Sequence, residues 1–210
     1  VNVHEMANLN FANDSKMWAS IMEGYQGNYQ AVYTEINISE LPSGKNTYLP
    51  ILIETEKKTK ILMTESNVMD YPHMFLKNNG ESGELVAVFP KYPVKTAPKN
   101  EKRTKVVETA EYMAKTNGKR SFPWRLFIIG NETTLLESNL VYQLASEQKL
   151  EDISWIKPGR VAWDWWNASN LYNVDFKAGI NTQTYKAYID FASENGLEYV
   201  ILDEGWSASI

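Results

Sequence analysis

The chain has 210 residues, of which 43% are hydrophobic and 22% charged, a composition typical of a globular protein. Its net charge of −5 provides no basic field for nucleic acid, and no run reaches the roughly 18 apolar residues of a membrane span. The absence of cysteine excludes disulfides and a thiolate nucleophile, and two histidines are too few for a typical structural zinc site. Any metal is therefore expected to be a hard cation with oxygen ligands.

From about residue 27 to 136, the sequence alternates short β-rich runs with turn signals. Such a pattern predicts an antiparallel sheet structure such as a sandwich. The predicted strands lie within Gln30–Ile38, Tyr48–Glu56, Lys58–Ser66, Glu84–Tyr92 and Arg120–Gly130. The segment 102–115 is compatible with a helix or a strand, and we predict a strand, because Asn117–Gly118 before a β-rich run signals a hairpin.

The second part of the chain has a different pattern. Residues 138–150 have helical composition, and Arg160–Trp166 is predicted to be a strand. A helix follows, which Asn181 or Thr182 can cap at its start and Gly196 at its end. Leu197–Trp206 then begins as a nearly all-apolar strand, as in a parallel sheet covered on both faces. Strand, helix and strand in this order predict a right-handed βαβ unit.

Two parallel strands and one helix cannot cover their own faces, and parallel α/β folds need several more strands. We therefore expect the chain to be a piece of a longer protein. The segment 147–158 is the candidate linker between its two parts.

Polar and aromatic residues gather where the two parallel strands end. The first ends with Trp163 and Asp164, and the second with Asp203, Glu204 and Trp206. In parallel folds ligands bind at the carboxyl ends of strands, although such acids can also meet solvent or cap the next helix. The indoles can stack on sugars or fill a core.

Strand alternation has two consequences for these side chains. It would place Trp163 and Trp165 on one face, and Asp164 and Trp166 on the other. It also points Asp203 and Glu204 in opposite directions, so they are not expected to form a catalytic pair. One of these two acids would then bind sugar hydroxyls while the other orients its surroundings.

Four segments in order resemble glycoside hydrolase family 97, which comprises bacterial α-glucosidases and α-galactosidases. They are TESNVMDYPHMFL, RSFPWRLFIIG, PGRVAWDWWNA with the helix beginning GINTQTYKAYIDFASENG, and EYVILDEGW. The resemblance implies a β-supersandwich domain followed by a (β/α)8 TIM barrel. Residues 1–150 would hold the C-terminal part of the sandwich and a linker helix, and residues 157–210 the first βαβ unit of an incomplete barrel.

The resemblance also implies site residues and a cofactor. Trp163, Asp164, Asp203, Glu204 and Trp206 match substrate-binding positions at the barrel mouth. Glu65 matches a calcium ligand, although a strand-end glutamate in a salt bridge is the alternative. The general acid and the base or nucleophile would lie outside this chain, which is expected to contain no catalytic residue and to be inactive by itself.

The leading hypothesis is therefore part of a calcium-dependent α-glycosidase, periplasmic or secreted, that acts on terminal α-glucosyl or α-galactosyl residues of oligosaccharides. Neither a nucleic-acid partner nor a membrane span is expected, and the oligomeric state stays open. A non-catalytic carbohydrate-binding sandwich is the second hypothesis, against which the βαβ unit argues. An unrelated barrel enzyme is the third, and it would leave the sandwich segments unexplained.

Overall fold

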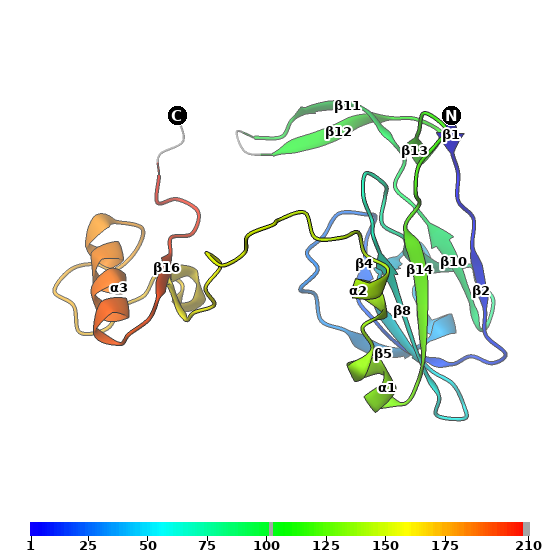
Figure 1. The fold of residues 1–210 in the computed structure, drawn as a ribbon, viewed down its shortest axis with the longest axis horizontal. Coiled ribbons are helices and arrows are strands. Elements are labelled where there is room, and N and C mark those ends of the chain that lie inside the picture. The colour runs from blue at the N-terminus through cyan, green and yellow to red at the C-terminus, as the bar shows by residue number, and fades with distance from the viewer. Residues whose placement is uncertain (101–102, 208–210) are drawn as a thin grey trace. The chain divides into compact units, whose positions relative to one another are not determined.

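A computed structural model describes residues 1–100 and 103–207. The chain divides into two compact units, residues 1–147 and residues 148–210, which we call unit 1 and unit 2. Unit 1 consists mainly of antiparallel strands, and unit 2 contains a parallel strand pair and a helix (Figure 1).

Two antiparallel five-stranded sheets form the body of unit 1. Sheet I has the order β2 (Asn8–Asn10), β10 (Glu84–Val88), β9 (Phe75–Asn78), β6 (Asn46–Tyr48) and β4 (Ile21–Met22). Sheet II has the order β14 (Trp124–Gly130), β8 (Lys60–Ser66), β7 (Ile51–Glu54), β3 (Lys16–Ala19) and β5 (Thr34–Asn37). The β-rich runs predicted around residues 58–66 and 120–130 are thus neighbouring strands of one sheet.

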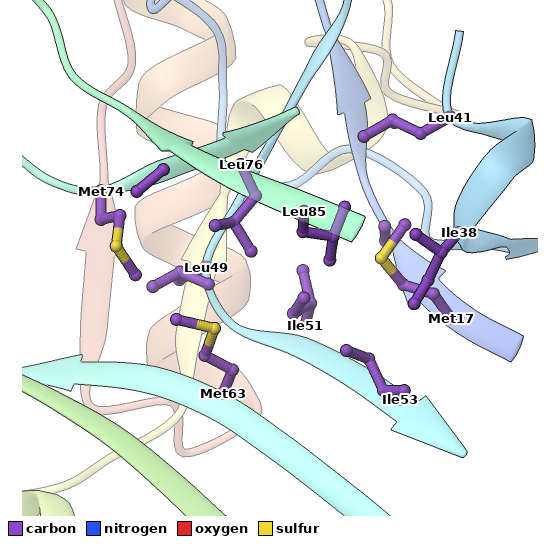
Figure 2. Packing of buried hydrophobic residues seen from close by; sticks show 12 residues of the cluster. Met17, Ile38, Leu41, Leu49, Ile51, Ile53, Met63, Met74, Leu76 and Leu85 are labelled. Carbon is purple, nitrogen blue, oxygen red and sulfur yellow. The ribbon is translucent and has the colours of Figure 1, made fainter. Parts of the chain in front are cut away.

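The two sheets share one hydrophobic core. Alternate residues of β7 and β10 are buried, as expected for strands that present one face to a core. Figure 2 shows Leu76 and Leu85 of sheet I on one side of this core and Ile51, Ile53 and Met63 of sheet II on the other. Each of these five side chains is at most 1% exposed. The sheets therefore pack face to face, as the sequence predicts for an antiparallel sandwich.

Smaller elements surround this core. The pair β1 (Asn2–Val3) and β13 (Ala114–Lys115) is antiparallel, as is the ribbon of β11 (Pro93–Pro98) and β12 (Thr104–Thr109). A 3-10 helix covers Ile38–Glu40, and α1 (Glu132–Glu137) and α2 (Leu140–Gln143) follow β14. The strand prediction for residues 102–115 is confirmed for β12 and β13, and Lys102 lies outside the described residues.

The hairpin predicted at Asn117–Gly118 is wrong. Strand β13 pairs with β1, and β14 pairs with β8, so the strands on either side of the dipeptide do not pair with each other. A two-residue hairpin turn of this kind needs positive φ at both positions. Gly118 has a φ of +103°, but Asn117 is not among the residues with positive φ.

Unit 2 contains the predicted strand, helix and strand. Strands β15 (Val161–Trp163) and β16 (Tyr199–Ile201) are parallel, with Ala162 opposite Val200. Helix α3 (Thr182–Glu194) begins at the predicted cap, where the Asn181 side chain accepts a hydrogen bond from Thr184 N at 2.9 Å. Its buried residues Tyr188 and Ala192 pack with Ala162 of β15.

The two strands of unit 2 are shorter and more exposed than the sequence predicts. Residues Asp164–Asn167 form a 3-10 helix instead of continuing β15, so the predicted alternation of Trp163, Asp164, Trp165 and Trp166 is wrong. The chain turns there because Ser169 N donates to Asp164 O at 2.8 Å. Among residues 138–150, only α2 is an α-helix.

Candidate functional site

A cavity of about 590 Å³ lies beyond the carboxyl ends of β15 and β16. This is where a parallel α/β fold binds its ligands. Its lining consists of residues from the turn after β15, the loop before α3 and the segment after β16. These residues are Asp164, Trp165, Ala168, Ser169, Gly179, Ile180, Asp203 and Glu204.

Asp164 is the most buried acid of this site, with 2% of its surface exposed. A buried carboxylate is costly unless hydrogen-bond donors compensate for its lost hydration. Two backbone N–H groups supply them, because Asp164 Oδ1 accepts from Trp165 N at 2.9 Å and from Asp203 N at 3.2 Å. Asp164 therefore connects the end of β15 to the segment that follows β16.

Asp203 receives two donors of its own. Its Oδ2 accepts a hydrogen bond from Trp163 Nε1 at 3.0 Å, and its Oδ1 accepts one from Glu204 N at 2.6 Å. Within the described residues, the carboxylate of the exposed Glu204 makes no hydrogen bond or ion pair. Of the three acids that line the cavity, Glu204 thus has the oxygens that are most available to a ligand.

Tyr185 of α3 contributes a second polar group to the buried side of the site. Burial raises the pKa of its hydroxyl, and the negative charge of Asp164 raises it further. The phenol oxygen is enclosed, and the Asp164 carboxylate is its polar neighbour. Tyr185 is therefore a neutral neighbour of the Asp164 carboxylate.

The predicted tryptophans take different positions. Trp163 lies against Trp166 with ring centroids 6.2 Å apart and planes 29° apart. Trp165, Trp166 and Trp206 expose 63%, 85% and 59% of their surfaces, and only Trp165 of these lines the cavity. The structure brings Asp164, Asp203 and Glu204 together at the cavity, with Trp163 touching Asp203, and does not bring Trp206 into the lining.

The sequence did not predict that loop residues with unusual backbone conformations form part of the site. Ala168 and Ser169 have left-handed φ angles of +50° and +55°. Alanine and serine do not indicate this backbone conformation in a sequence. Gly205 is also required, because its φ is +97° and a Cβ there would lie 2.9 Å from Ile180 Cδ1. The available signal was the position of these residues in loops after the strands.

Glu65 lies in unit 1 in a network of ion pairs. Its Oε1 accepts from an Arg125 guanidinium nitrogen and from Met74 N at 3.1 Å, and its Oε2 lies 3.2 Å from His73 Nδ1. Arg125 also binds Glu5 in a two-pronged pair, at 2.8 and 2.9 Å. The Glu65 side chain is only 7% exposed. In this arrangement Glu65 is the ion-paired strand residue of the alternative interpretation.

The residues around Glu65 do not form a calcium site by themselves. Calcium takes six to eight oxygen ligands, and no group of three or more histidines or acids in residues 1–100 and 103–207 could hold a metal. Both Glu65 oxygens already face nitrogen groups. The calcium role of Glu65 stays a prediction, and a metal ligand here would first have to leave Arg125.

Tyr71 is hydrogen-bonded to the same network of charged residues. Its hydroxyl donates to Glu5 Oε2 at 3.1 Å, and burial, reinforced by the charge of Glu5, raises its pKa from 10.0 to about 12. Between these pH values the unfolded chain releases this proton while the folded chain keeps it, so stability falls as the pH rises from 10 to 12. We expect the tyrosinate absorbance of wild type minus Tyr71→Phe to titrate near pH 12. A midpoint near 10 would contradict this.

A second cavity, of about 510 Å³, lies in unit 1. Its lining includes the rings of Tyr71 and Tyr92, and the charged residues Asp70, Lys91 and Lys115. Arg120 stabilises the backbone next to this cavity, because its guanidinium donates to Met69 O at 2.6 Å and Asp70 O at 3.0 Å. This cavity combines apolar faces with groups that can form hydrogen bonds.

Comparisons with known proteins match both units. Residues 2–146 match the family described as Glycosyl-hydrolase 97 N-terminal, and residues 165–210 match Glycoside hydrolase 97. The retaining alpha-galactosidase of Bacteroides thetaiotaomicron is 40% identical over 185 residues, which are 87% of this chain and 28% of the relative. A probable retaining alpha-galactosidase of Streptomyces bingchenggensis is 34% identical over 91 residues, 43% of this chain and 13% of that protein.

Solved structures agree in fold. A family 97 enzyme from Pseudoalteromonas sp. strain K8, in complex with acarbose, superposes with a TM-score of 0.64 at 22% identity. Its complex with panose gives the same values. The match covers 94% of this chain and 28% of the enzyme, so the chain spans little more than a quarter of these relatives. With residues 2–146 and 165–210 matched in order, this chain belongs to glycoside hydrolase family 97.

Proposed function

We propose that the protein containing this chain is an α-glycosidase that removes terminal α-galactosyl or α-glucosyl residues from oligosaccharides. The observation that carries the proposal is the cavity beyond β15 and β16, where Asp164, Asp203 and Glu204 meet beside exposed indoles. The exposed Glu204 carboxylate can accept hydrogen bonds from sugar hydroxyls, and indoles stack on the apolar faces of sugars. Unit 2 would then be the first βαβ unit of a (β/α)8 barrel.

The domain division follows from the same proposal. Residues 1–150 belong to a β-supersandwich domain with a linker, and residues 157–210 to the opening of the barrel. The exposed apolar side chains of unit 2 support this, because Val161, Tyr199 and Ile201 are each more than 40% exposed. Further barrel strands and helices would cover them, as the fold requires.

The relatives support α-galactosidase as the specific activity. Two curated relatives bear that name, and both names include the word retaining. The structures with acarbose and panose keep an α-glucosidase within the proposal. The general acid and the nucleophile are placed outside this chain, so residues 1–210 alone are expected to be inactive. A calcium requirement remains part of the proposal for the whole protein, without a step assigned to the ion.

The whole protein tests the proposal directly. With calcium present, it should release nitrophenol from 4-nitrophenyl α-galactoside or α-glucoside, and residues 1–210 should release none. Absence of release from both substrates by the folded whole protein would refute the proposed function.

Glu204 gives the sharpest single-residue test. Glu204→Gln removes the charge of the cavity carboxylate that accepts no hydrogen bond within the described residues. A hydrogen bond to a charged group contributes about 1.5–3 kcal/mol, so kcat/KM should fall roughly ten- to hundred-fold. Glu194→Gln, at the end of α3 and outside the cavity lining, is the matched control and should leave kcat/KM unchanged.

A carbohydrate-binding sandwich remains the second candidate function, and the cavity of unit 1 is the observation that favours it. Tyr92 exposes 37% of its surface there, beside Asp70 and Lys115. Calorimetric titration of residues 1–210 with oligosaccharides separates the two candidates. Affinity that disappears in Tyr92→Ala but survives in Tyr142→Ala, an exposed control on α2, would support the binding module.

We also propose a periplasmic or secreted location, which rests on the resemblance to enzymes of polysaccharide utilisation. No α-helix in the described ranges, residues 1–100 and 103–207, has the length and hydropathy to cross a bilayer. Fractionation of the source cells tests the location, and recovery of the protein with the cytoplasmic fraction would contradict it.

A further inference from the structure

The three acids of the unit 2 cavity differ in how many of their acceptor positions are already used. Asp164 is buried and gives one oxygen to two backbone N–H groups. Asp203 uses both oxygens, one for Trp163 Nε1 and one for Glu204 N. Glu204 uses neither within the described residues. The carboxylates thus range from Asp164, which is buried and hydrogen-bonded, to Glu204, which is exposed and accepts no hydrogen bond within the described residues. This difference indicates that the three acids have different roles.

The contacts form a reciprocal connection between the ends of the two strands. Asp164, after β15, accepts the backbone N–H of Asp203, after β16, at 3.2 Å. In the other direction, Trp163 of β15 donates its indole N–H to the Asp203 carboxylate at 3.0 Å. Residues at the end of β15 therefore bind both the backbone N–H and the carboxylate of Asp203. Asp203 immediately precedes Glu204.

The turn after Asp164 closes on the backbone carbonyl of that residue. Asp164 O accepts from Ser169 N at 2.8 Å, and Ala168 and Ser169 are both left-handed. Two consecutive non-glycine residues in this region are strained, so their surroundings must hold them there. Both residues line the cavity, so this backbone hydrogen bond shapes part of the cavity wall.

We propose that Asp164 and Trp163 are positioning residues, which act through Asp203 to fix the direction of the Glu204 carboxylate, and that they do not themselves bind sugar. This revises the role expected from sequence, where both residues are substrate-binding. The inference rests on the proposed function, since it concerns the same cavity.

A double-mutant cycle in the whole enzyme tests the inference. Asp164→Ala should lower kcat/KM about ten- to hundred-fold in the wild-type background but less than about threefold in Glu204→Gln, because residues that act through one another are not additive. Asp164→Asn keeps an acceptor oxygen and should recover most of the activity. Additive losses, or no recovery with asparagine, would overturn the inference.

Trp163→Phe provides a variant with less risk to folding. It keeps an aromatic ring but removes the indole N–H, and it should show the same lack of additivity with Glu204→Gln. Trp155→Phe is the matched control: Trp155 is 68% exposed, and its N–H donates to Asp152 O at 3.2 Å, outside the cavity lining. This control should retain wild-type kcat/KM, whereas additive losses in Trp163→Phe and Glu204→Gln would contradict the proposal.

A second measurement does not depend on activity. In residues 1–210, the Trp163 indole N–H should exchange with solvent at least about tenfold more slowly than that of exposed Trp165, because it is hydrogen-bonded. Asp164→Ala should remove this protection, and Asp164→Asn should retain it. Equal exchange of the two indoles would overturn the inference even if the enzyme is active. An inactive wild-type enzyme with the expected exchange would instead refute the proposed function and leave the connection between the strands intact.

Discussion

Arg125→Met is expected to destabilise unit 1 by about 3–5 kcal/mol, the usual cost of removing one partner from a buried charge pair. The Arg125 side chain is 16% exposed and lies between Glu65, which is 7% exposed, and Glu5, which is 25% exposed. Methionine fills a similar volume but leaves two carboxylates close together without their shared cation. Urea unfolding of residues 1–210 measures the change.

Matched variants separate this effect from a general loss of surface charge. Lys91→Met removes an ion pair with Glu111 in which the side chains are 51% and 89% exposed, so solvent screens the pair and the loss should be much smaller than that of Arg125→Met. Arg125→Lys keeps the charge but loses the two-pronged geometry, and it should fall between the two. A loss below about 1 kcal/mol for Arg125→Met would contradict the role of Arg125 as the shared cation.

The Arg125 network also shows why the surroundings of Glu65 escaped sequence analysis. Arg125 lies 60 residues from Glu65 and 120 residues from Glu5 along the chain. Its position opposite Glu65 follows from the register of β14 with β8, which pairs these two residues directly. Register depends on which residues of both strands are buried together, and a single segment does not contain that information.

Strand prediction succeeded where hydrophobic patterns were long. Strands β8 and β14 each have seven residues, and both were predicted from their apolar runs. Strands β1, β2 and β4 have two or three residues each, too short for alternation to be detected, and they were missed, as was the four-residue β3. Their place in the sheets follows from pairing with distant strands.

At the candidate site, the residue types were predictable but their directions were not. The end of β15 was misplaced because Asp164 accepts the N–H of Trp165 and ends the strand. Short polar side chains compete with strand pairing in this way, and the sequence VAWDWW does not reveal whether Asp164 continues the strand or ends it. Once the strand ends at Trp163, alternation no longer decides which side chains face the cavity.

Leu76→Ala is expected to destabilise unit 1 by about 2–5 kcal/mol, because the transfer cost of the lost methyl groups adds to that of the cavity left behind. Leu76 is fully buried on β9 and faces the side chains of sheet II in the shared core (Figure 2).

Two further leucine variants show whether the loss comes from the buried position of Leu76. Leu76→Met conserves most of the volume and should cost less than about 1.5 kcal/mol. Leu136→Ala, on α1 and 86% exposed, should change the stability by less than about 0.5 kcal/mol. If Leu76→Ala and Leu136→Ala have equal effects, the two sheets do not share the core that their buried faces indicate. Sheet I carries Leu76 and sheet II carries Glu65 and Arg125, so a single urea transition that shifts as a whole in both Leu76→Ala and Arg125→Met would show that the two sheets unfold together.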